Sequence, residues 1–463
     1  GEHDAAVRFY TAALRLAPSH RLYDSRGVSY ASLGRYKEAL ADLGQALALC
    51  PRDETAHRNR GNVHMQQGKL EEAIGDYSQA AALNPRSVAA FYNRGEAYRL
   101  HGEPDRAIAD YTQAIQLDPQ FAAAYNNRGG VQSRRGDNRQ AVADYSQAIA
   151  LDPLSAEAYN NRGIAHADQG EWKLAIADFG QAIALKPELA EAYNNRGLAF
   201  AGLDNQQQAI ADYTQAVGLE PSYADAYGNR GAAYFGLGNL DQAMADFDEA
   251  IRANPKYAPA YVGRGLAFAQ QGELGKAIAD YSQAITIDPQ HAPAYAGRGN
   301  AYAAQGLLEQ AINDYSQAIV LNPQHAATYL NRGVAYGQRG EPLQAILDYT
   351  QAIALDPQHV GALVNRGVAY AEQGDLEKAT VDLKEALGLQ PDCAPAHVGR
   401  GIVHSRQGDF EQAIADYGQA MELDPQDAEA YNYRGMAYVE HGELDNAIDD
   451  FCLLYTSPSP RDL

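Results

Sequence analysis

An Arg-Gly pair recurs every 34 residues along this chain of 463 residues, and no other feature of the sequence constrains its fold as strongly. The series runs from Gly27 to Gly435 without an insertion. An Ala lies twelve residues after each of these glycines, and in the first twelve copies a Pro lies twenty-four residues after the glycine. Self-similarity at a fixed period of this length indicates a repeat architecture rather than a set of separate domains. We therefore expect one continuous array over residues 20–451.

Each period has the pattern of two short helices. Apolar and small residues stand at helical spacing, as Tyr193, Gly197 and Phe200 do at i, i+4 and i+7. A second Gly follows the repeat glycine after seven residues in every copy except one, which has Asp204 there, and such a Gly can close a helix in the left-handed conformation. The Pro at the end of the period stops the second helix. The sequence thus predicts an all-α chain of antiparallel helix hairpins.

The order of an aromatic residue, Gly, an aromatic, Ala, an aromatic, Ala and Pro resembles the tetratricopeptide repeat over roughly residues 1–451. One copy carries it at Tyr193, Gly197, Phe200, Ala209, Tyr213, Ala216 and Pro221. The resemblance implies a right-handed superhelical solenoid whose first helices line a concave groove. It also implies a protein–protein interaction scaffold that binds peptides or segments of partner proteins in that groove.

An Arg precedes every repeat glycine, and an Asp follows each of these arginines after sixteen residues. This recurrence favours pairing, within a repeat or across to the next, because a guanidinium can hold a carboxylate through two hydrogen bonds. The alternative is a basic ladder that binds phosphates or acidic peptides. The predicted members of a structural ion-pair ladder include Arg162, Asp178, Arg196, Asp212, Arg230 and Asp246.

Asparagine precedes the Arg-Gly pair in eight repeats, and in three of them a second Asn stands beside it. A similar asparagine ladder lines the superhelix of the O-linked N-acetylglucosamine transferases, and that resemblance implies that the amides hold an extended peptide by its backbone. An amide offers both a donor and an acceptor to a peptide group. Local hydrogen bonding or helix capping is an equally open interpretation. The predicted groove residues are Asn93, Asn126, Asn127, Asn160, Asn161, Asn194, Asn195, Asn229, Val262, Leu330, Asn331, Val364 and Asn365.

The two halves of this predicted groove differ in chemistry. Asn93 to Asn229 form an amide-rich half, whereas apolar residues stand two places before the arginine further along. Small Gly263 and Gly297 also replace the adjacent Asn there. We expect the first half to hold a peptide backbone and the second half to offer a shallow apolar track.

A second device of the family, a clamp for the carboxylates of acidic peptides, is matched only in part. Arg58, Asn62 and Asn93 fit its pattern, but Ala123 and Asn127 stand where cationic residues are required. Because a carboxylate needs charge-assisted donors, this ligand is disfavoured.

The formal net charge of −22 disfavours nucleic acid and anionic membranes as partners. No stretch approaches the length of about 18 apolar residues that spans a bilayer. His57 and His64, like His397 and His404, lie about 10 Å apart along one helix and cannot share an ion. Cys393 and His397 form only half a zinc site. We expect no catalytic residues, no cofactor and no metal, and the three cysteines are compatible with a cytoplasmic location.

The two ends of the chain depart from the repeat. Residues 1–19 have the pattern of a second helix whose first helix is missing, and residues 452–463 form a tail that back-translates to a sequencing adapter. The rival interpretation of the tail is a genuine disordered segment. Uncapped ends allow self-association. Two functional alternatives therefore remain: a substrate-recruiting arm of a larger enzyme, such as an O-linked glycosyltransferase, and a structural or self-assembling solenoid.

Overall fold

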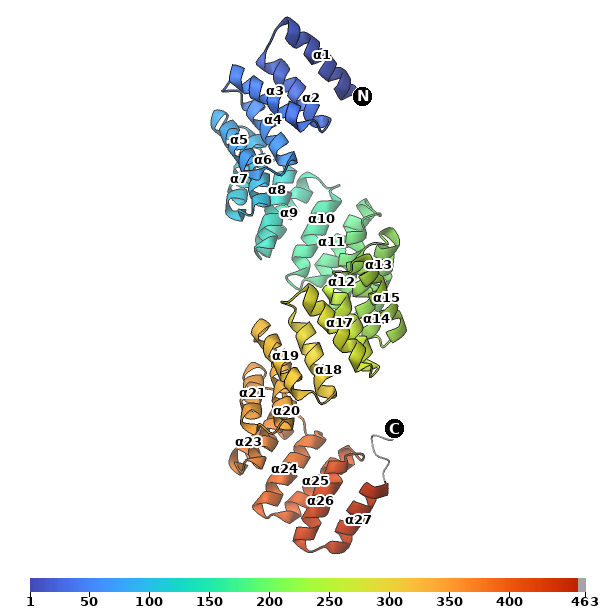
Figure 1. The fold of residues 1–463 in the computed structure, drawn as a ribbon. Helices are drawn as coiled ribbons and strands as arrows, with labels where there is room; N and C mark the ends of the chain where they lie inside the picture. The colour runs from blue at the N-terminus through green and yellow to red at the C-terminus, as the bar shows by residue number, and fades with distance from the viewer. Residues whose placement is uncertain (457–463) are drawn as a thin grey trace. The chain divides into compact units, whose positions relative to one another are not determined.

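The computed structural model describes residues 1–456, with side chains as far as Cys452. This part of the chain consists of twenty-seven α-helices and contains no β-strand (Figure 1). The all-α hairpin architecture predicted from the sequence is confirmed. The chain divides into two compact units, residues 1–233 and residues 234–463, called unit 1 and unit 2 below.

The helices of unit 1 are α1 (Glu2–Leu16), α2 (His20–Ser32), α3 (Tyr36–Leu49), α4 (Glu54–Gln66), α5 (Leu70–Leu83), α6 (Val88–His101), α7 (Pro104–Leu117), α8 (Ala122–Arg134), α9 (Asn138–Leu151), α10 (Ala156–Ala167), α11 (Trp172–Leu185), α12 (Ala190–Gly202), α13 (Gln206–Leu219) and most of α14 (Ala224–Gly236). Unit 2 contains α15 (Leu240–Ala253), α16 (Ala258–Gln270), α17 (Leu274–Ile287), α18 (Ala292–Ala304), α19 (Leu308–Leu321), α20 (Ala326–Gln338), α21 (Pro342–Leu355), α22 (Val360–Glu372), α23 (Leu376–Leu389), α24 (Ala394–Gln407), α25 (Phe410–Leu423), α26 (Ala428–His441) and α27 (Leu444–Thr456).

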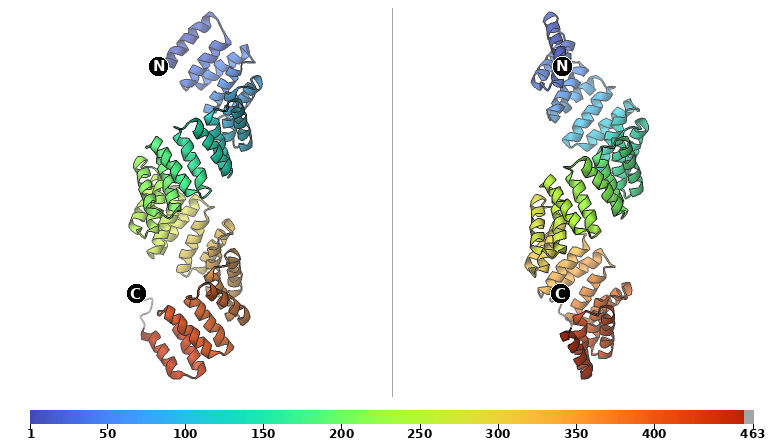
Figure 2. Two further views of the ribbon diagram at one scale, coloured as in Figure 1. Left: turned by 180° about the vertical axis from the view of Figure 1, so that it is seen from behind. Right: turned by 90° about the vertical axis from the view of Figure 1, so that its right-hand side faces the viewer.

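Even-numbered helices are the first helices of the repeats and odd-numbered helices are the second. Within each unit, a first helix packs along the second helix that follows it, as α8 does on α9 and α18 on α19. Within each unit, neighbouring helices follow one another in chain order (Figure 2). First helices also contact the next first helix, for example α8 with α10 and α22 with α24, whereas second helices make no comparable contact with each other in the described part. The first helices therefore lie on the inner, more crowded side of each unit.

The turn inside each hairpin depends on a left-handed residue. Gly34 has a φ of 73° and Gly442 a φ of 91°, as expected for glycines that end a first helix. Asp204, which interrupts the glycine series in the sequence, adopts the same conformation with a φ of 59°. Asp tolerates this region better than most residues, so the hairpin turn survives the substitution.

Close packing of aromatic rings on small residues builds the core of most repeats, and Leu43 and Leu383 take the place of the ring in two of them. Tyr213 is 1% exposed, and a Cβ added to Gly197 would lie 2.6 Å from its ring. Ala209 and Ala216, on either side of Tyr213 on the same helix, are fully buried. The repeat glycine is therefore a contact surface for the ring of the second helix, and a larger side chain would force the two helices apart.

Helix α27 continues beyond residue 451 to Thr456. The remainder of the predicted tail, residues 457–463, lies outside the described residues. None of the helices in the described chain combines the length and the hydropathy needed to cross a bilayer.

Candidate protein-interaction groove

Arginine and aspartate join the two helices of each repeat. Arg162 donates from Nε and Nη2 to the two carboxylate oxygens of Asp178 at 2.8 and 2.7 Å. Asp178 is 6% exposed, and its hydrogen bond raises the pKa of Arg162. Pairs of this kind, each within one repeat, are formed with the Asp sixteen residues later by Arg26, Arg60, Arg94, Arg128, Arg162, Arg196, Arg264, Arg298, Arg332, Arg366, Arg400 and Arg434.

The remaining guanidinium nitrogen, Nη1, reaches the preceding repeat, a contact that the sequence pattern did not predict. Arg162 Nη1 donates to Ser146 Oγ at 3.0 Å, and Arg332 Nη1 donates to Ser316 Oγ at the same distance. Arg230 likewise donates to Thr214 Oγ1 at 3.1 Å. The signal was present in the sequence as a Ser or Thr two residues after most of the ladder aspartates.

The guanidinium of Arg162 also lies over the ring of Tyr159, with its carbon 5.6 Å from the ring centroid. Its fork holds Asp178, its remaining nitrogen holds a hydroxyl, and its face covers an aromatic ring. A guanidinium engaged in this way links two repeats and has no free edge for a phosphate. This geometry favours the structural ladder over a basic phosphate-binding ladder.

The asparagines of unit 1 form a chain of hydrogen bonds between successive first helices. Each bond runs from the Asn before an Arg to the first Asn of the preceding repeat: Asn161 to Asn126 at 3.2 Å, Asn195 to Asn160 at 3.2 Å and Asn229 to Asn194 at 2.9 Å. Asn160 and Asn194 are only 3% and 4% exposed. The first Asn of a pair therefore serves mainly to join repeats, which is the local role that the sequence left open.

The second Asn of the two later pairs, Asn161 and Asn195, keeps an N–H for further hydrogen bonding. Asn161 and Asn195 are half-buried on first helices, and each donates one N–H to its neighbour. A side-chain amide carries two N–H donors and an oxygen with two lone pairs. The neighbouring amide orients the side chain and leaves further groups for a ligand, so the groove role of these residues stays a prediction.

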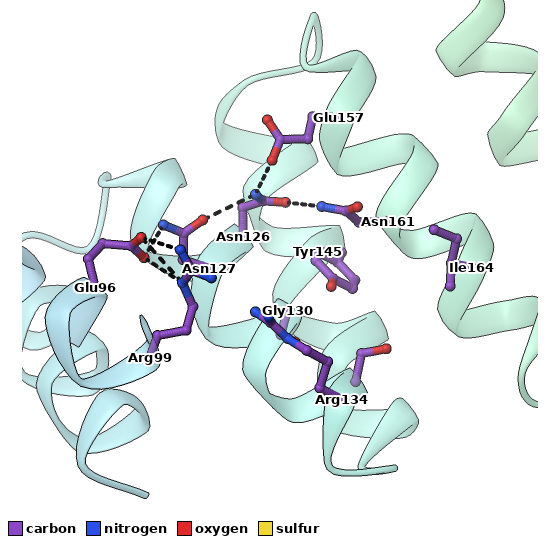
Figure 3. A pocket seen from close by; sticks show the side chains of 11 residues that line it. Glu96, Arg99, Asn126, Asn127, Gly130, Arg134, Tyr145, Glu157, Asn161 and Ile164 are labelled. Atoms are coloured by element: carbon purple, nitrogen blue, oxygen red, sulfur yellow. Dashed lines mark hydrogen bonds and ion pairs between the residues drawn. The ribbon is translucent and has the colours of Figure 1, made fainter. Parts of the chain in front are cut away.

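A polar pocket of about 470 Å³ opens over α6, α8 and α10 in unit 1 (Figure 3). Asn126 lies between Glu157 and Asn161, within 3.4 and 3.2 Å of their polar atoms. The pocket is lined by Glu96, Arg99, Asn126, Asn127, Gly130, Ser133, Arg134, Tyr145, Glu157, Asn161 and Ile164. Amides and charged groups thus dominate this face.

Asn127 is the best-anchored amide of this pocket. Its Nδ2 donates to Glu96 Oε1 at 2.7 Å and to the Tyr92 hydroxyl at 2.9 Å. Glu96 is also paired with Arg99 at 2.8 Å. At the start of the asparagine series, Asn93 donates to Asn62 Oδ1 at 3.1 Å.

The corresponding face of unit 2 is apolar. A pocket of about 280 Å³ there is lined by Val262, Leu266, Tyr281, Ala292, Pro293, Ala296, Gly297, Asn300, Ala318, Asn322, His325 and Thr328. Leu330 is half-buried, whereas Val364 is 5% exposed and packs in a core cluster with Leu363 and Leu383. Val364 therefore lies beneath the surface of the groove. Asn331 donates to Asn300 Oδ1 at 3.0 Å, and Asn365 is half-buried.

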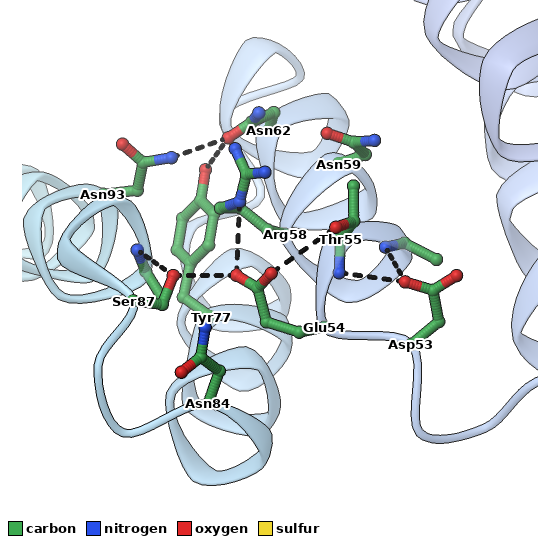
Figure 4. Close-up of polar contacts among 12 residues, drawn as sticks. Asp53, Glu54, Thr55, Arg58, Asn59, Asn62, Tyr77, Asn84, Ser87 and Asn93 are labelled. Carbon is green, nitrogen blue, oxygen red and sulfur yellow. Dashed lines mark hydrogen bonds and ion pairs between the residues drawn. The ribbon is translucent and has the colours of Figure 1, made fainter.

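The partial carboxylate clamp is engaged locally (Figure 4). Arg58 Nε donates to Glu54 Oε1 at 3.3 Å, and the oxygen of Asn62 accepts hydrogen bonds from the Tyr77 hydroxyl at 2.8 Å and from Asn93. A carboxylate already neutralises the cation, so the structure adds a second reason to disfavour an acidic peptide at this position.

The histidine pairs flank ladder aspartates. His57 Nδ1 lies 3.6 Å from one oxygen of Asp76 and His64 Nδ1 lies 3.2 Å from the other. His397 Nδ1 and His404 Nε2 lie 3.8 and 3.7 Å from the two oxygens of Asp416, and His397 Nε2 lies 2.9 Å from the Pro391 carbonyl oxygen. Each imidazole pair thus stands on either side of one carboxylate, consistent with a packing role.

Models of the tetratricopeptide repeat match most of the chain. One TPR repeat model matches residues 27–68, 133–170, 165–204, 203–238, 265–306, 299–340 and 405–442. Other tetratricopeptide repeat models match residues 58–122, 224–257, 326–359, 348–380 and 394–415. The chain belongs to the tetratricopeptide-repeat family. Its repeats make it a protein-interaction scaffold of that family.

One solved structure shares the fold, and two others are similar over part of this chain. The chain is similar to a chain of the APC/C hetero-tetramer Cut9-Hcn1, with 17% identity, a TM-score of 0.53, and coverage of 99% of this chain and 92% of that chain. MamA is 30% identical over 35% of this chain and 96% of its own, with a TM-score of 0.34. A tetratricopeptide repeat protein from Parabacteroides merdae is 20% identical over 54% of this chain and 98% of its own, with a TM-score of 0.44. No curated protein matches the chain.

Proposed function

We propose that unit 1 holds an extended segment of a partner protein on the inner faces of α6, α8, α10 and α12. The observation that carries this proposal is the polar pocket over three successive first helices, in which neighbouring side chains orient the Asn161 amide and the Asn127 oxygen. Since an extended segment offers one backbone donor and one acceptor per residue, amides that recur once per repeat suit its backbone rather than particular side chains.

The negative charge of the pocket and of the chain favours some partner segments over others. Glu157 lines the pocket, and its only hydrogen bond within the described chain comes from Asn126. The chain as a whole carries a formal charge of −22. A segment with basic or uncharged side chains therefore suits this groove better than an acidic segment.

Unit 2 supplies a different surface for the same kind of partner. Val262, Leu266 and Ala296 line its pocket, and such shallow apolar surface suits side chains or the apolar face of a helix. We propose that this surface takes apolar side chains of a partner segment.

Selection of peptides from a displayed library against the full chain, followed by titration, tests the proposal. Changing Asn127, Asn161 and Asn195 together to Ala should weaken a selected extended peptide, because each lost hydrogen bond is worth about 0.5–1.5 kcal/mol. The matched control changes Asn331 and Asn365 to Ala in unit 2. Circular dichroism must show intact folding, since Asn195 also bonds the buried Asn160. Unchanged affinity in the folded triple variant would leave these asparagines with a role in joining repeats only.

Self-association is a second candidate, favoured by apolar side chains on α1. Phe9 is 68% exposed and Leu16 is 89% exposed. Light scattering over a range of concentrations should detect association if these side chains pack against a second chain. Phe9→Ser with Leu16→Gln should then restore the monomer, and an unchanged mass in that variant would exclude α1 as the contact.

A further inference from the structure

Three side chains of metal-ligand type meet at the first repeat junction. His20 begins α2, Cys50 directly follows α3, and Asp53 precedes α4. A ring nitrogen, the sulfur and a carboxylate oxygen all lie within 4.8 Å of one another. His20 Nδ1 is 2.8 Å from Asp53 Oδ2, and all three residues are partly exposed. An ion could therefore reach all three atoms from solvent.

The backbone holds these residues in place. The Cys50 amide donates to the Ala46 carbonyl and closes α3, and the Asp53 amide donates to the Cys50 carbonyl at 3.2 Å. Asp53 Oδ1 caps α4 by accepting from the amides of Thr55 and Ala56 at 3.0 and 3.2 Å. The other oxygen of Asp53 faces His20. The carboxylate can thus cap a helix with one oxygen and bind an ion with the other.

At the next repeat junction, the three equivalent positions hold residues that do not form a set of metal ligands. One repeat later they are Glu54, Asn84 and Ser87, and Ser87 Oγ donates to Glu54 Oε1 at 2.8 Å (Figure 4). The fold therefore brings these positions together as part of repeat stacking. In the later repeats the first position is Val or Ala, which cannot bind a metal. The combination of imidazole, thiol and carboxylate at the first junction is not required by the repeat.

We propose that His20, Cys50 and Asp53 bind one Zn²⁺ ion. Thiolate sulfur, imidazole nitrogen and carboxylate oxygen are the ligands of zinc sites, at distances of about 2.0–2.3 Å. The thiol selects zinc over magnesium and calcium, which take oxygen ligands. Binding releases the thiol proton to solvent, and His20 binds in its neutral form. His20 Nδ1 and Asp53 Oδ2 need to separate by about half an ångström to reach tetrahedral positions around the ion.

The sequence predicted no metal site because His20 lies 30 and 33 positions before Cys50 and Asp53, which share the turn between α3 and α4. In the structure, the ion would join α2, α3 and α4. It would link the first two complete repeats. Three protein ligands leave a fourth position for water or for a side chain of a partner.

Titration with Co²⁺ tests the site directly, because a cobalt–thiolate bond gives a charge-transfer band in the near ultraviolet. The experiment uses the full chain with Cys393→Ser and Cys452→Ser, so that Cys50 is the sole thiol, under conditions that keep it reduced. We expect one Co²⁺ per chain, displacement of the band by Zn²⁺, and a higher melting temperature with Zn²⁺.

Variants at each ligand separate this site from adventitious binding. Cys50→Ser should abolish the band. His20→Gln and Asp53→Asn should each weaken binding at least about tenfold, since even an outer-shell partner of a metal ligand contributes 10–100-fold. Asp53→Asn keeps an oxygen that caps α4, so folding is preserved. Glu54→Gln at the next junction is the matched control and should leave the affinity unchanged.

Two outcomes would overturn the proposal. One is the absence of the band in a chain that circular dichroism shows to be folded. The other is a band whose affinity is the same in the His20→Gln and Asp53→Asn variants, which would indicate metal held by the thiol alone.

Discussion

Unit 1 and unit 2 have the same ion-pair ladder but different inner faces. Arg162 in unit 1 and Arg332 in unit 2 hold their aspartates and the preceding serine at nearly identical distances. The pocket of unit 1 is lined largely by amides and charged groups, whereas that of unit 2 is lined largely by apolar residues such as Val262, Leu266 and Ala296, with no charged carboxylate or guanidinium. The comparison shows that the repeat restricts the residues that join helices and leaves the exposed positions of the first helices open to different recognition chemistry.

The physical origin of the difference lies one residue before the arginine. Asn at this position in unit 1 bonds the preceding repeat. In unit 2 it is Gly in three repeats, and a Cβ on Gly263 or Gly297 would lie 2.5 or 2.6 Å from the ring of Phe247 or Tyr281. In unit 2 these rings therefore lie directly against the glycines. The apolar face of unit 2 therefore follows from the missing amide, because a buried ring at the same register, such as Tyr145 before Asn161, is present in unit 1 as well.

We expect the largest effect from alkaline pH, and unfolding at high pH tests whether the cores of the two units are equally stable. Burial raises the pKa of Tyr145 in unit 1, and of Tyr281, Tyr315 and Tyr349 in unit 2, to about 12. The pKa of an unfolded tyrosine is about 10. The stability contributed by these groups is therefore complete below pH 10 and lost as the pH rises through 12.

We expect circular dichroism and phenolate absorbance to change together in a single transition over this alkaline range. Buried tyrosines should ionise as the chain unfolds, rather than while it is still folded. Two separate transitions would show that the cores differ as the grooves do.

Breaking one ladder pair should have the next largest effect, and the same effect in both units. Arg196→Met in unit 1 or Arg332→Met in unit 2 leaves a buried carboxylate unpaired, which costs about 3–5 kcal/mol. Adding Asp212→Leu or Asp348→Leu, respectively, should restore most of that stability. Urea unfolding measures both. Equal unfolding midpoints for the single and double variants would mean that the pairs do not stabilise the fold. A large difference between the two units in the loss of stability would mean that the ladder does not contribute equally to both.

Placing the asparagine of unit 1 at the corresponding glycine of unit 2 tests why the two grooves differ. Gly297→Asn should destabilise unit 2 by about 1–3 kcal/mol, because the new side chain overlaps the buried ring of Tyr281. Gly388→Asn on α23 is the control, since nothing lies within 4 Å of a Cβ added there. Thermal unfolding compares the two variants. Equal melting temperatures would mean that the ring moves aside at no cost.

The smallest expected effect concerns the hydroxyl that joins neighbouring repeats. Double-mutant cycles of Ser146→Ala with Arg162→Met, and of Ser316→Ala with Arg332→Met, should each give a coupling energy of about 0.5–1.5 kcal/mol. Because Ser→Ala is measured both with and without the arginine, the effect of Ala on helix stability cancels in the coupling energy. A coupling energy near zero would mean that water replaces the hydroxyl without loss.

The sequence predicted several local features correctly because they depend on single residues. Glycines such as Gly34 have the positive φ that ends a first helix. Asp204 broke the expected pattern yet kept the turn, since its backbone adopts the same conformation. The pairing of Arg with Asp was predicted, but the sequence left open whether it joins one repeat or two.

The candidate sites were predictable only in part. Residues such as Asn126 were identified from their register, but the bonds that bury Asn160 and Asn194 depend on how successive first helices approach. Val364 has the register of a groove residue and yet packs in the core. His20, Cys50 and Asp53 gave no signal at all, because their spacing matches no local metal motif.

The sequence by itself determined the period, the all-α hairpins and the residues of the ladder. These features arise from helix propensity, helix-ending residues and a spacing repeated along the chain, all of which act locally. Only the tertiary structure decided which asparagines are buried, which face is apolar and which ligand-type residues meet at a junction. Those outcomes depend on contacts between repeats, where residues 31 to 35 positions apart come together at distances that the angle and separation of the packed helices set.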